Sequence, residues 1–230
     1  TDRSLFMAEA FFDFDVIQAK YADLKFEAGW TFLCCHADRL HDAQIAIVGL
    51  NPGGRDDEGP YCTQWATGEN SYYAEKWGQE ASGKPAYDRL QLQIQKWHDF
   101  AGVKENETLC AQFTPFRSRD WAGLKHQEKA VIDFSRQLWR WVLANSAAKT
   151  FLTMGKVPGQ QIAKLLNAKP RASLPTGWGK QTIEVYSNAG NRRVIAMPHP
   201  SRFTLFDRAN QASAIAETSL SEALSPQFDL

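Results

Sequence analysis

The chain has 230 residues, the length of one large domain or at most two small ones, and we expect a single domain over residues 1–230. Hydrophobic residues make up 43% of the chain and aromatic residues 12%, which excludes an intrinsically disordered protein. Acidic and basic residues balance at 26 each, so the overall charge does not indicate nucleic acid, although a neutral total can conceal a basic face.

The four cysteines are Cys34, Cys35, Cys62 and Cys110, and no two of them form a Cys-x-x-Cys pair. This spacing is not that of a zinc or iron–sulfur site, and it favours free thiols in a reducing compartment. No stretch approaches the roughly 18 apolar residues of a membrane span, and the start of the chain is not typical of a signal peptide. We therefore expect a cytoplasmic protein with no membrane partner, no metal and no cofactor.

Hydrophobic periodicity predicts helices and strands that alternate along the chain. In chain order, the pattern predicts a helix over 15–29, a strand over 44–49, a helix over 85–100, a strand over 107–113, a helix over 127–144, a strand over 149–154, a helix over 158–167, a hairpin of 181–186 and 192–198, and a helix over 207–224. This order predicts an α/β domain with a mainly parallel core. The segment from Asn51 to about Pro85 is long, irregular and aromatic, which favours a functional loop over disorder.

Polar or rigid residues follow each predicted core strand. In an open parallel sheet, ligands bind outside the carboxyl ends of the strands, so we expect these segments to meet at one edge. Each alone has an ordinary interpretation, as a turn, a loop histidine or a surface arginine, and neither a P-loop nor a dinucleotide-binding motif is present. The segments are Gly49-Leu50-Asn51-Pro52-Gly53, Gln112-Phe113-Thr114-Pro115-Phe116-Arg117-Ser118, Met154-Gly155-Lys156 and Met197-Pro198-His199-Pro200-Ser201.

The first and last of these segments resemble the motif pair of the uracil-DNA glycosylase superfamily. Asn51-Pro52-Gly53 is similar to the single-strand-selective monofunctional and mismatch-specific branches, and His199-Pro200-Ser201 to the single-strand-selective and classical uracil branches. Glu58-Gly59-Pro60-Tyr61 resembles the stretch whose aromatic ring stacks on the flipped base, and Gln112 lies where the family usually keeps an asparagine that reads the uracil edge. The resemblance covers about residues 44–205.

The resemblance implies a three-layer α/β/α sandwich on a four-stranded, mainly parallel sheet, and hydrolysis of an N-glycosidic bond in DNA. Asn51 would orient the water that attacks the sugar, and His199 would donate an N–H to the departing base. Tyr61, or failing it Trp65, would stack on the base. Some branches carry an iron–sulfur cluster, but the cysteine spacing does not match, and we expect none. The other expected substrate contacts are Gly49, Leu50, Pro52, Gly53, Gln112, Phe113 and Ser201.

The expected partner is DNA, single-stranded or damaged duplex, bound by a monomer. Basic side chains would contact phosphates and make binding salt-dependent, and an apolar side chain after His199 would wedge into the vacated stack or pack against the last helix. The candidate phosphate contacts are Arg117, Arg119, Lys156, Arg192, Arg193 and Arg202, and the candidate wedges are Phe203, Leu205 and Phe206.

Glutamine at position 112 leaves the preferred base open, because its carboxamide reaches one methylene further than that of asparagine. Uracil, hypoxanthine, xanthine or another modified base remains possible. Three functions are compatible with the sequence. The first is a DNA glycosylase, the second is a catalytically weak or inactive binding module on the same fold, and the third is a small-molecule enzyme such as a nucleoside hydrolase. The motif combination favours the first.

Overall fold

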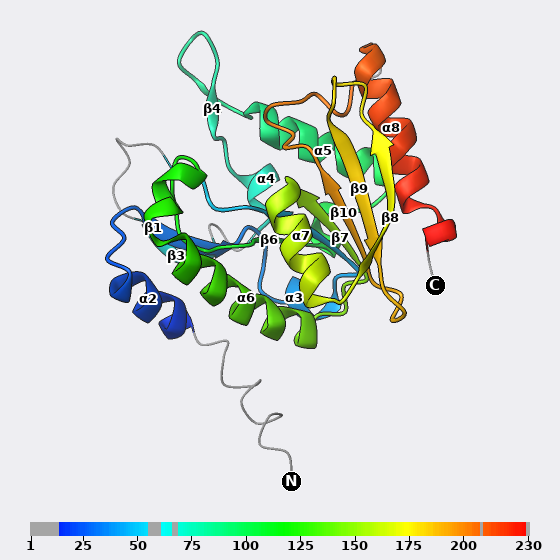
Figure 1. Ribbon diagram of the computed structural model, residues 1–230. Helices are drawn as coiled ribbons and strands as arrows, with labels where there is room; N and C mark the ends of the chain where they lie inside the picture. Colours follow the sequence, from blue (N-terminus) through cyan, green and yellow to red (C-terminus); the bar gives the residue numbers. More distant parts are fainter. Residues whose placement is uncertain (1–13, 55–60, 66–68, 208, 229–230) are drawn as a thin grey trace.

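The computed structural model describes residues 14–54, 61–65, 69–207 and 209–228. In this part, the chain forms an α/β fold around one eight-stranded mixed sheet (Figure 1). The strand order is β3-β1-β6-β2-β7-β10-β9-β8, and a separate pair, β4 and β5, forms a small hairpin. The strands are β1 (Gly29–Leu33), β2 (Ile45–Gly49), β3 (Tyr61–Trp65), β4 (Gly78–Gln79), β5 (Pro85–Ala86), β6 (Thr108–Gln112), β7 (Thr150–Met154), β8 (Lys169–Pro175), β9 (Thr182–Ser187) and β10 (Arg193–Met197).

Four neighbouring strands in the middle of the sheet, β6, β2, β7 and β10, run parallel to one another. On one side of them β1 runs antiparallel to β6 and pairs in parallel with β3, and on the other side β9 and β8 form an antiparallel extension. The α/β class and the parallel core are therefore confirmed. The expected total of four strands is wrong, because four described strands extend the parallel core at its two sides.

The helices precede, connect and follow the strands. The longest is the predicted helix over 127–144, which the structure confirms as α6. The helices are α2 (Phe14–Asp23), α3 (Arg39–Asp42), α4 (Ser71–Ala74), α5 (Arg89–Ala101), α6 (Glu128–Asn145), α7 (Lys156–Leu165) and α8 (Gln211–Leu224), with 3₁₀ turns at Glu105–Glu107, Trp121–Gln127 and Pro226–Phe228.

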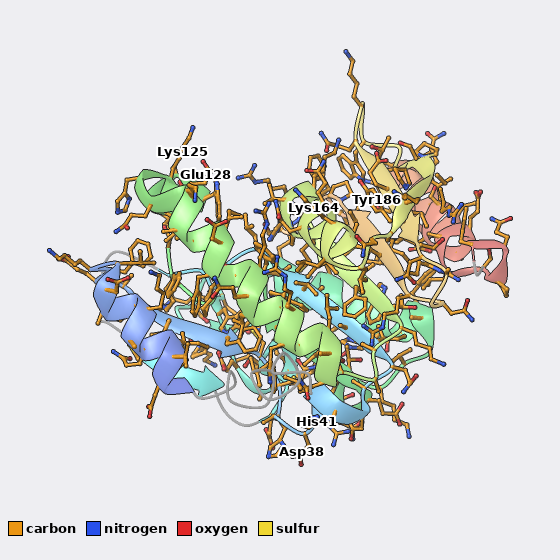
Figure 2. All side chains as sticks on the ribbon, turned by 60° about the horizontal axis from the view of Figure 1, so that its bottom comes forward. Asp38, His41, Lys125, Glu128, Lys164 and Tyr186 are labelled. Atoms are coloured by element: carbon orange, nitrogen blue, oxygen red, sulfur yellow. The ribbon has the colours of Figure 1, made fainter. Side chains whose placement is uncertain are left out.

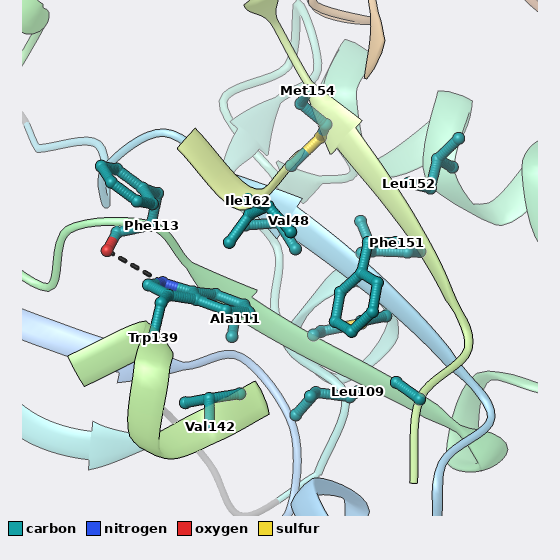
Figure 3. Packing of buried hydrophobic residues seen from close by; sticks show 14 of the residues in the cluster. Val48, Leu109, Ala111, Phe113, Trp139, Val142, Phe151, Leu152, Met154 and Ile162 are labelled. Atoms are coloured by element: carbon teal, nitrogen blue, oxygen red, sulfur yellow. Dashed lines mark hydrogen bonds between the residues drawn. The ribbon is translucent and has the colours of Figure 1, made fainter. Parts of the chain in front are cut away.

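Helices cover both faces of the parallel core, with α6 and α7 in front and α5 behind in Figure 1. Successive side chains of a strand point to opposite faces, and β6 shows this directly. Its Ala111 lies beside Trp139 of α6 (Figure 3), whereas the hydroxyl of Thr108 contacts the Nε2 atom of His98 in α5 at 3.2 Å. Both faces are therefore buried, which explains why the core strands are apolar throughout rather than alternating.

Two predicted helix boundaries are wrong, and local backbone chemistry explains both. The first helix ends at Asp23 rather than at residue 29, and positive φ angles follow at Lys25 (53°) and Gly29 (88°), which a continuing right-handed helix cannot contain. The helix predicted from residue 85 begins at Arg89, because Asp88 caps it by accepting the backbone N–H of Gln91 at 2.8 Å. The remaining predicted helices and strands agree with the structure at their ends to within about four residues.

The sequence analysis missed β1, β3 and β8 of the main sheet, and the two-residue strands β4 and β5. β1 is buried over its whole length and was assigned to the end of a helix and the residues after it. β3 falls inside the segment interpreted as irregular. β8 is an edge strand, and it contains Pro170 and Pro175, which edge strands tolerate and central strands do not.

The carboxyl ends of the parallel strands define one end of the molecule. In Figure 2, Lys125 and Glu128 mark the start of α6, which runs back from this end, and Asp38 and His41 lie at the opposite end, before β2. No helix in the described ranges is long and apolar enough to cross a membrane.

Trp139 is expected to fix the carboxyl end of β6. Its buried indole N–H donates to the backbone carbonyl of Gln112 at 3.1 Å. It also donates to that of Phe113 at 3.0 Å, which Figure 3 shows. Trp139→Phe leaves these carbonyls without that donor, so we expect the free energy of unfolding to fall by about 1–3 kcal/mol. Denaturant unfolding measures the change.

The matched control is Trp121→Phe, which removes an indole N–H that donates to the exposed side chain of Glu128. We expect a change within about 0.5 kcal/mol for this variant. Equal destabilisation by the two substitutions would contradict the role assigned to Trp139.

Candidate functional site

The four segments singled out in the sequence follow β6, β2, β7 and β10, so their backbones share one edge of the sheet. The pairing continues past the strand ends, since Phe113 N–H donates to the carbonyl of Gly49 at 2.8 Å and Gly155 N–H to that of Met197 at 2.8 Å. Neighbouring strands lie about 4.8 Å apart, and β7 separates β2 from β10. The Asn51 and His199 segments therefore start roughly 10 Å apart, a gap that a planar ring and two side chains can fill.

Asn51 is held by its carboxamide nitrogen. This nitrogen donates to the carbonyl of Pro52 at 2.9 Å and to that of Ser118 at 2.8 Å. Because both neighbours are acceptors, they fix which end of the carboxamide is nitrogen. Both N–H groups are used, and no described residue donates to the Oδ1 atom of Asn51. The side chain thus presents an oriented, neutral acceptor.

Arg117 supports the Asn51 turn through hydrogen bonds to backbone carbonyls. Its side chain is only 8% exposed, and its guanidinium donates to the carbonyls of Gly53 at 3.1 Å and Ala28 at 3.2 Å. The adjacent Ser118 N–H donates to the carbonyl of Pro52 at 3.2 Å. The sequence analysis assigned Arg117 to DNA phosphates, and its burial and its carbonyl partners favour a supporting role instead.

His199 is half-buried between two buried prolines and follows β10. Its Nδ1 atom accepts the hydroxyl of Ser201 at 2.8 Å and the backbone N–H of Ser201 at 3.3 Å. Since a backbone N–H can only donate, Nδ1 is the unprotonated nitrogen and Nε2 carries the hydrogen. Burial, with a smaller contribution from the charge of Arg202, lowers the pKa of His199 to about 4. At neutral pH, the ring is an uncharged N–H donor.

Gln112 lies across the end of β2. It pairs with Gly49 in the sheet, and its carboxamide rests against the α-carbon of Gly49, where a Cβ atom would overlap it. The side chain is 7% exposed, its Nε2 donates to the sulfur of Cys34 at 3.3 Å, and its Oε1 is buried with no hydrogen-bond partner among the described residues. Gly49 therefore provides the space in which the Gln112 carboxamide lies.

The other predicted contacts after β2 and β6 differ in access. Leu50 is half-buried, Pro52 is buried and Gly53 is exposed. Phe113 is fully buried, and its ring packs in the cluster with Trp139 (Figure 3), so it stiffens this edge from within.

The segment after His199 divides into exposed and buried parts. Ser201 and Arg202 are exposed, and Phe203 is half-buried with its ring 6.1 Å from that of Trp178. Leu205 is fully buried, and its backbone N–H donates to Gln93 of α5 at 2.7 Å. Of these two candidates for insertion into the DNA base stack, Phe203 is therefore the accessible one. Leu205 instead anchors the segment to α5.

Lys156 is exposed at the first position of α7, directly after β7. It is at the same edge as Asn51 and His199 and remains a candidate phosphate contact. Arg192 donates to the carbonyls of Leu143 at 2.7 Å and Ser146 at 3.1 Å. Arg193 is 5% exposed and begins β10 at the far edge, so these two arginines serve the fold.

Tyr61 and Trp65 are the two ends of β3. Tyr61 pairs with Gly29 at the edge that carries Arg117, and Trp65 pairs with Leu33 toward the opposite edge. β3 is three strands from β2, roughly 14 Å away. Stacking by either ring stays a prediction that concerns side chains outside the described residues, as does the motif over residues 58–60.

Two contacts of the site were missed by the sequence analysis. Cys34 was considered only for its spacing, and the carbonyl of Ser118 carries no side-chain signal. The apolar run before Cys34 could have indicated a strand that ends beside β6. No sequence pattern indicates that the Ser118 carbonyl faces Asn51.

The described residues contain no group of three histidine, cysteine, aspartate or glutamate side chains arranged to hold a metal ion. All four cysteines are free thiols, and burial raises the pKa values of Cys34 and Cys35 to about 12. Both groups are therefore neutral thiols at physiological pH.

Two grooves lined by described residues lie apart from the candidate site. One, of about 980 Å³, runs between α2 and the start of α6, and the other, of about 480 Å³, is lined by residues around Cys35 and Asn70 near the opposite edge. Neither is lined by Asn51, Gln112 or His199.

No protein-family model matches the chain, and a search of curated proteins found none that is detectably similar.

We expect nuclear magnetic resonance of ¹⁵N-labelled protein to find His199 neutral at pH 7, with the proton on Nε2 and a pKa near 4. Unfolded histidine binds its proton near pH 6.5, so between pH 6.5 and 4 the unfolded chain binds more protons. The free energy of unfolding therefore falls as the pH decreases through this window, and His199→Gln reduces that slope. A proton on Nδ1, or an unshifted pKa, contradicts the assignment.

Proposed function

We propose that this chain is a monofunctional DNA glycosylase that hydrolyses the N-glycosidic bond of a flipped-out uracil or another deaminated base. The observation that carries the proposal is the pair of neutral groups at one sheet edge. Asn51 presents a carboxamide oxygen to which no described residue donates, and His199 presents an Nε2–H donor. The proposal includes a fold of the uracil-DNA glycosylase type, for which the four parallel strands β6, β2, β7 and β10 between helical layers are the support.

The two groups act on different parts of the substrate. Hydrolysis develops positive charge on the sugar and negative charge on the departing base. Asn51 Oδ1 accepts a hydrogen bond from water and holds its oxygen toward the anomeric carbon. His199 Nε2–H donates to the base oxygen as that oxygen gains charge, which stabilises the transition state more than the ground state. A neutral histidine does this without transferring its proton.

The base must leave the duplex stack, or come from a single strand, before it can reach this edge. Exposed Lys156 and Arg202 flank the edge and would contact phosphates. Phe203 would contact the gap left by the base, and its partial burial against Trp178 provides a rigid support for that contact.

A binding module with little or no catalysis is the second candidate. The observation that favours it is that Asn51 is a carboxamide, which cannot remove a proton from water as a carboxylate can. Such a module would bind modified DNA tightly without releasing a base, so an assay that counts abasic sites separates the two candidates.

The test is single-turnover cleavage of uracil- and hypoxanthine-containing oligonucleotides, single-stranded and duplex. We expect the wild-type protein to form abasic sites, and Asn51→Ala and His199→Ala each to lower the rate by about 10²–10³. His41→Ala is the matched control, because His41 is exposed at the opposite end of the molecule (Figure 2). Wild-type rates in Asn51→Ala and His199→Ala would refute the proposal, and cleavage of a free deoxynucleoside but no oligonucleotide would favour a nucleoside hydrolase.

Arg202 and Arg117 should differ in the salt dependence of DNA binding. Arg202→Ala removes an exposed charge, so the slope of log binding constant against log salt should become shallower by about 1.

Arg117→Lys breaks a buried contact with Gly53, so we expect slower cleavage with an unchanged slope. A shallower slope for Arg117→Gln, which removes the charge, would restore Arg117 as a phosphate contact.

A further inference from the structure

The antiparallel extension of the sheet brings a turn to the candidate site. β8 and β9 lie beyond β10 (Figure 1), and β9 runs antiparallel to β10, with Glu184 opposite Ala196 near the end of β10. The turn that joins β8 to β9, residues 176–181, therefore lies at the carboxyl edge of the parallel strands, where His199 follows β10. The proposed function uses this turn only as a support for Phe203.

Hydrogen bonds and two glycines fix the shape of this turn. The hydroxyl of Thr176 donates to the carbonyl of Gln181 at 2.9 Å and accepts the backbone N–H of Trp178 at 3.2 Å. The N–H of Gln181 donates to the carbonyl of Trp178 at 3.0 Å. Gly177 and Gly179 have φ angles of 73° and 59°, and a Cβ atom at Gly177 would overlap the backbone of α8. The Gly-Trp-Gly sequence therefore determines where Trp178 lies.

Trp178 is half-buried, and its polar atom faces the protein. The indole N–H donates to the carbonyl of Thr204 at 3.1 Å, and the ring lies 6.1 Å from that of Phe203 at an angle of 62°. Thr204 is itself held, because its hydroxyl accepts from Arg89 of α5 at 2.5 Å and its carbonyl from Ser213 of α8 at 2.5 Å. A ring fixed in this way loses little conformational entropy when a planar group stacks on its exposed part.

The backbone connects this ring to His199. The N–H groups of Arg202 and Phe203 donate to the carbonyl of His199 at 2.9 Å and 3.3 Å, so residues 199–203 form one tight turn. Lys180 and Arg202 are exposed, and no described carboxylate forms an ion pair with either side chain. A nucleotide offers a flat base and an anionic phosphate, which match an aromatic ring and unpaired cations.

We propose that Trp178 and Lys180 form a second nucleotide subsite, which binds the nucleotide next to the excised base. This inference rests on the proposed function, in which the excised base contacts His199. Trp178 stacks on the neighbouring base, and Lys180 contacts a phosphate beside it. Every base has a flat face, so the subsite accepts any neighbour. It therefore adds affinity for a nucleic-acid strand, and a free base or nucleoside gains nothing from it.

The test removes the neighbouring base from the ligand and the ring from the protein. Equilibrium binding is measured for single-stranded oligonucleotides that carry a 2′-fluorinated uracil nucleotide, which resists hydrolysis, with an abasic spacer before it, after it or in neither place. Stacking of one base on an aromatic side chain is worth about 5- to 150-fold in affinity. We expect the wild-type protein to lose this factor with the spacer on one side of the uracil. Trp178→Ala should lose it with the complete oligonucleotide and lose nothing further with that spacer.

Two further variants separate stacking from support of the fold. Trp178→Phe keeps a flat face and should retain most of the affinity and of the spacer effect. Trp121→Ala is the matched control, because Trp121 is also half-buried and its indole N–H donates to Glu128, away from the turn. It should leave all three affinities unchanged. If Trp178 only supported Phe203, its removal would weaken binding but leave the spacer effect in place.

The contribution of Lys180 is measured by salt dependence. Lys180→Ala should make the slope of log binding constant against log salt shallower by about 1, because one phosphate contact is lost. Lys164→Ala is the matched control, since Lys164 is exposed in the last turn of α7, away from the carboxyl edge (Figure 2). It should leave the slope unchanged.

The outcomes separate this inference from the proposed function. A spacer effect that Trp178→Ala abolishes supports the subsite even if the protein forms no abasic sites. Unchanged binding in Trp178→Ala, by a wild-type protein that cleaves uracil DNA, overturns the subsite and leaves the proposed function intact. A spacer effect that persists in Trp178→Ala, an equal loss in Trp121→Ala, or an unchanged slope in Lys180→Ala would also overturn the subsite. Absence of binding to any oligonucleotide would overturn both.

Discussion

The structure of the site depends on two backbone carbonyls that hold the carboxamide nitrogen of Asn51. Pro52 and Ser118 supply them, and because both are acceptors the oxygen of Asn51 must face away from them. The Ser118 carbonyl comes from the segment after β6, and the same segment donates back to the Asn51 turn through Ser118 and Arg117. The ends of β2 and β6 therefore form one rigid unit. The conformational entropy of these segments is lost when the protein folds, so little more is lost when a ligand binds.

Neutral groups dominate this unit. Asn51, Gln112, Cys34 and His199 are all uncharged at pH 7, the last because burial lowers its pKa to about 4. Uncharged dipoles in fixed positions can stabilise charge that develops during a reaction without first having to release counter-charges. The exposed charges, such as Arg202 and Lys156, lie at the margin, where long-range attraction needs no fixed geometry. This division fits a chain whose acidic and basic residues balance.

Much of the parallel core could be predicted from the sequence, because buried strands such as Ile45–Gly49 are apolar runs that stop at turn residues. The outer strands could not. β1 follows a helix, and the hydrophobic pattern does not show where the helix ends. β8 contains two prolines, which argue against a central strand. Within the site, the strand-end rule indicated Asn51, Gln112 and His199. It could not show that Arg117 is buried, that Leu205 faces inward, or that Ser201 selects the tautomer of His199, because these depend on contacts between segments far apart in sequence.

The most direct measurement is a crystal structure of the protein soaked with free uracil. Our account predicts one ring at the carboxyl edge of the parallel strands, with a uracil oxygen within about 3 Å of His199 Nε2. The ring should leave Asn51 Oδ1 open to the side on which a sugar would attach. Uracil bound elsewhere, or bound with His199 out of hydrogen-bonding reach, would contradict the account.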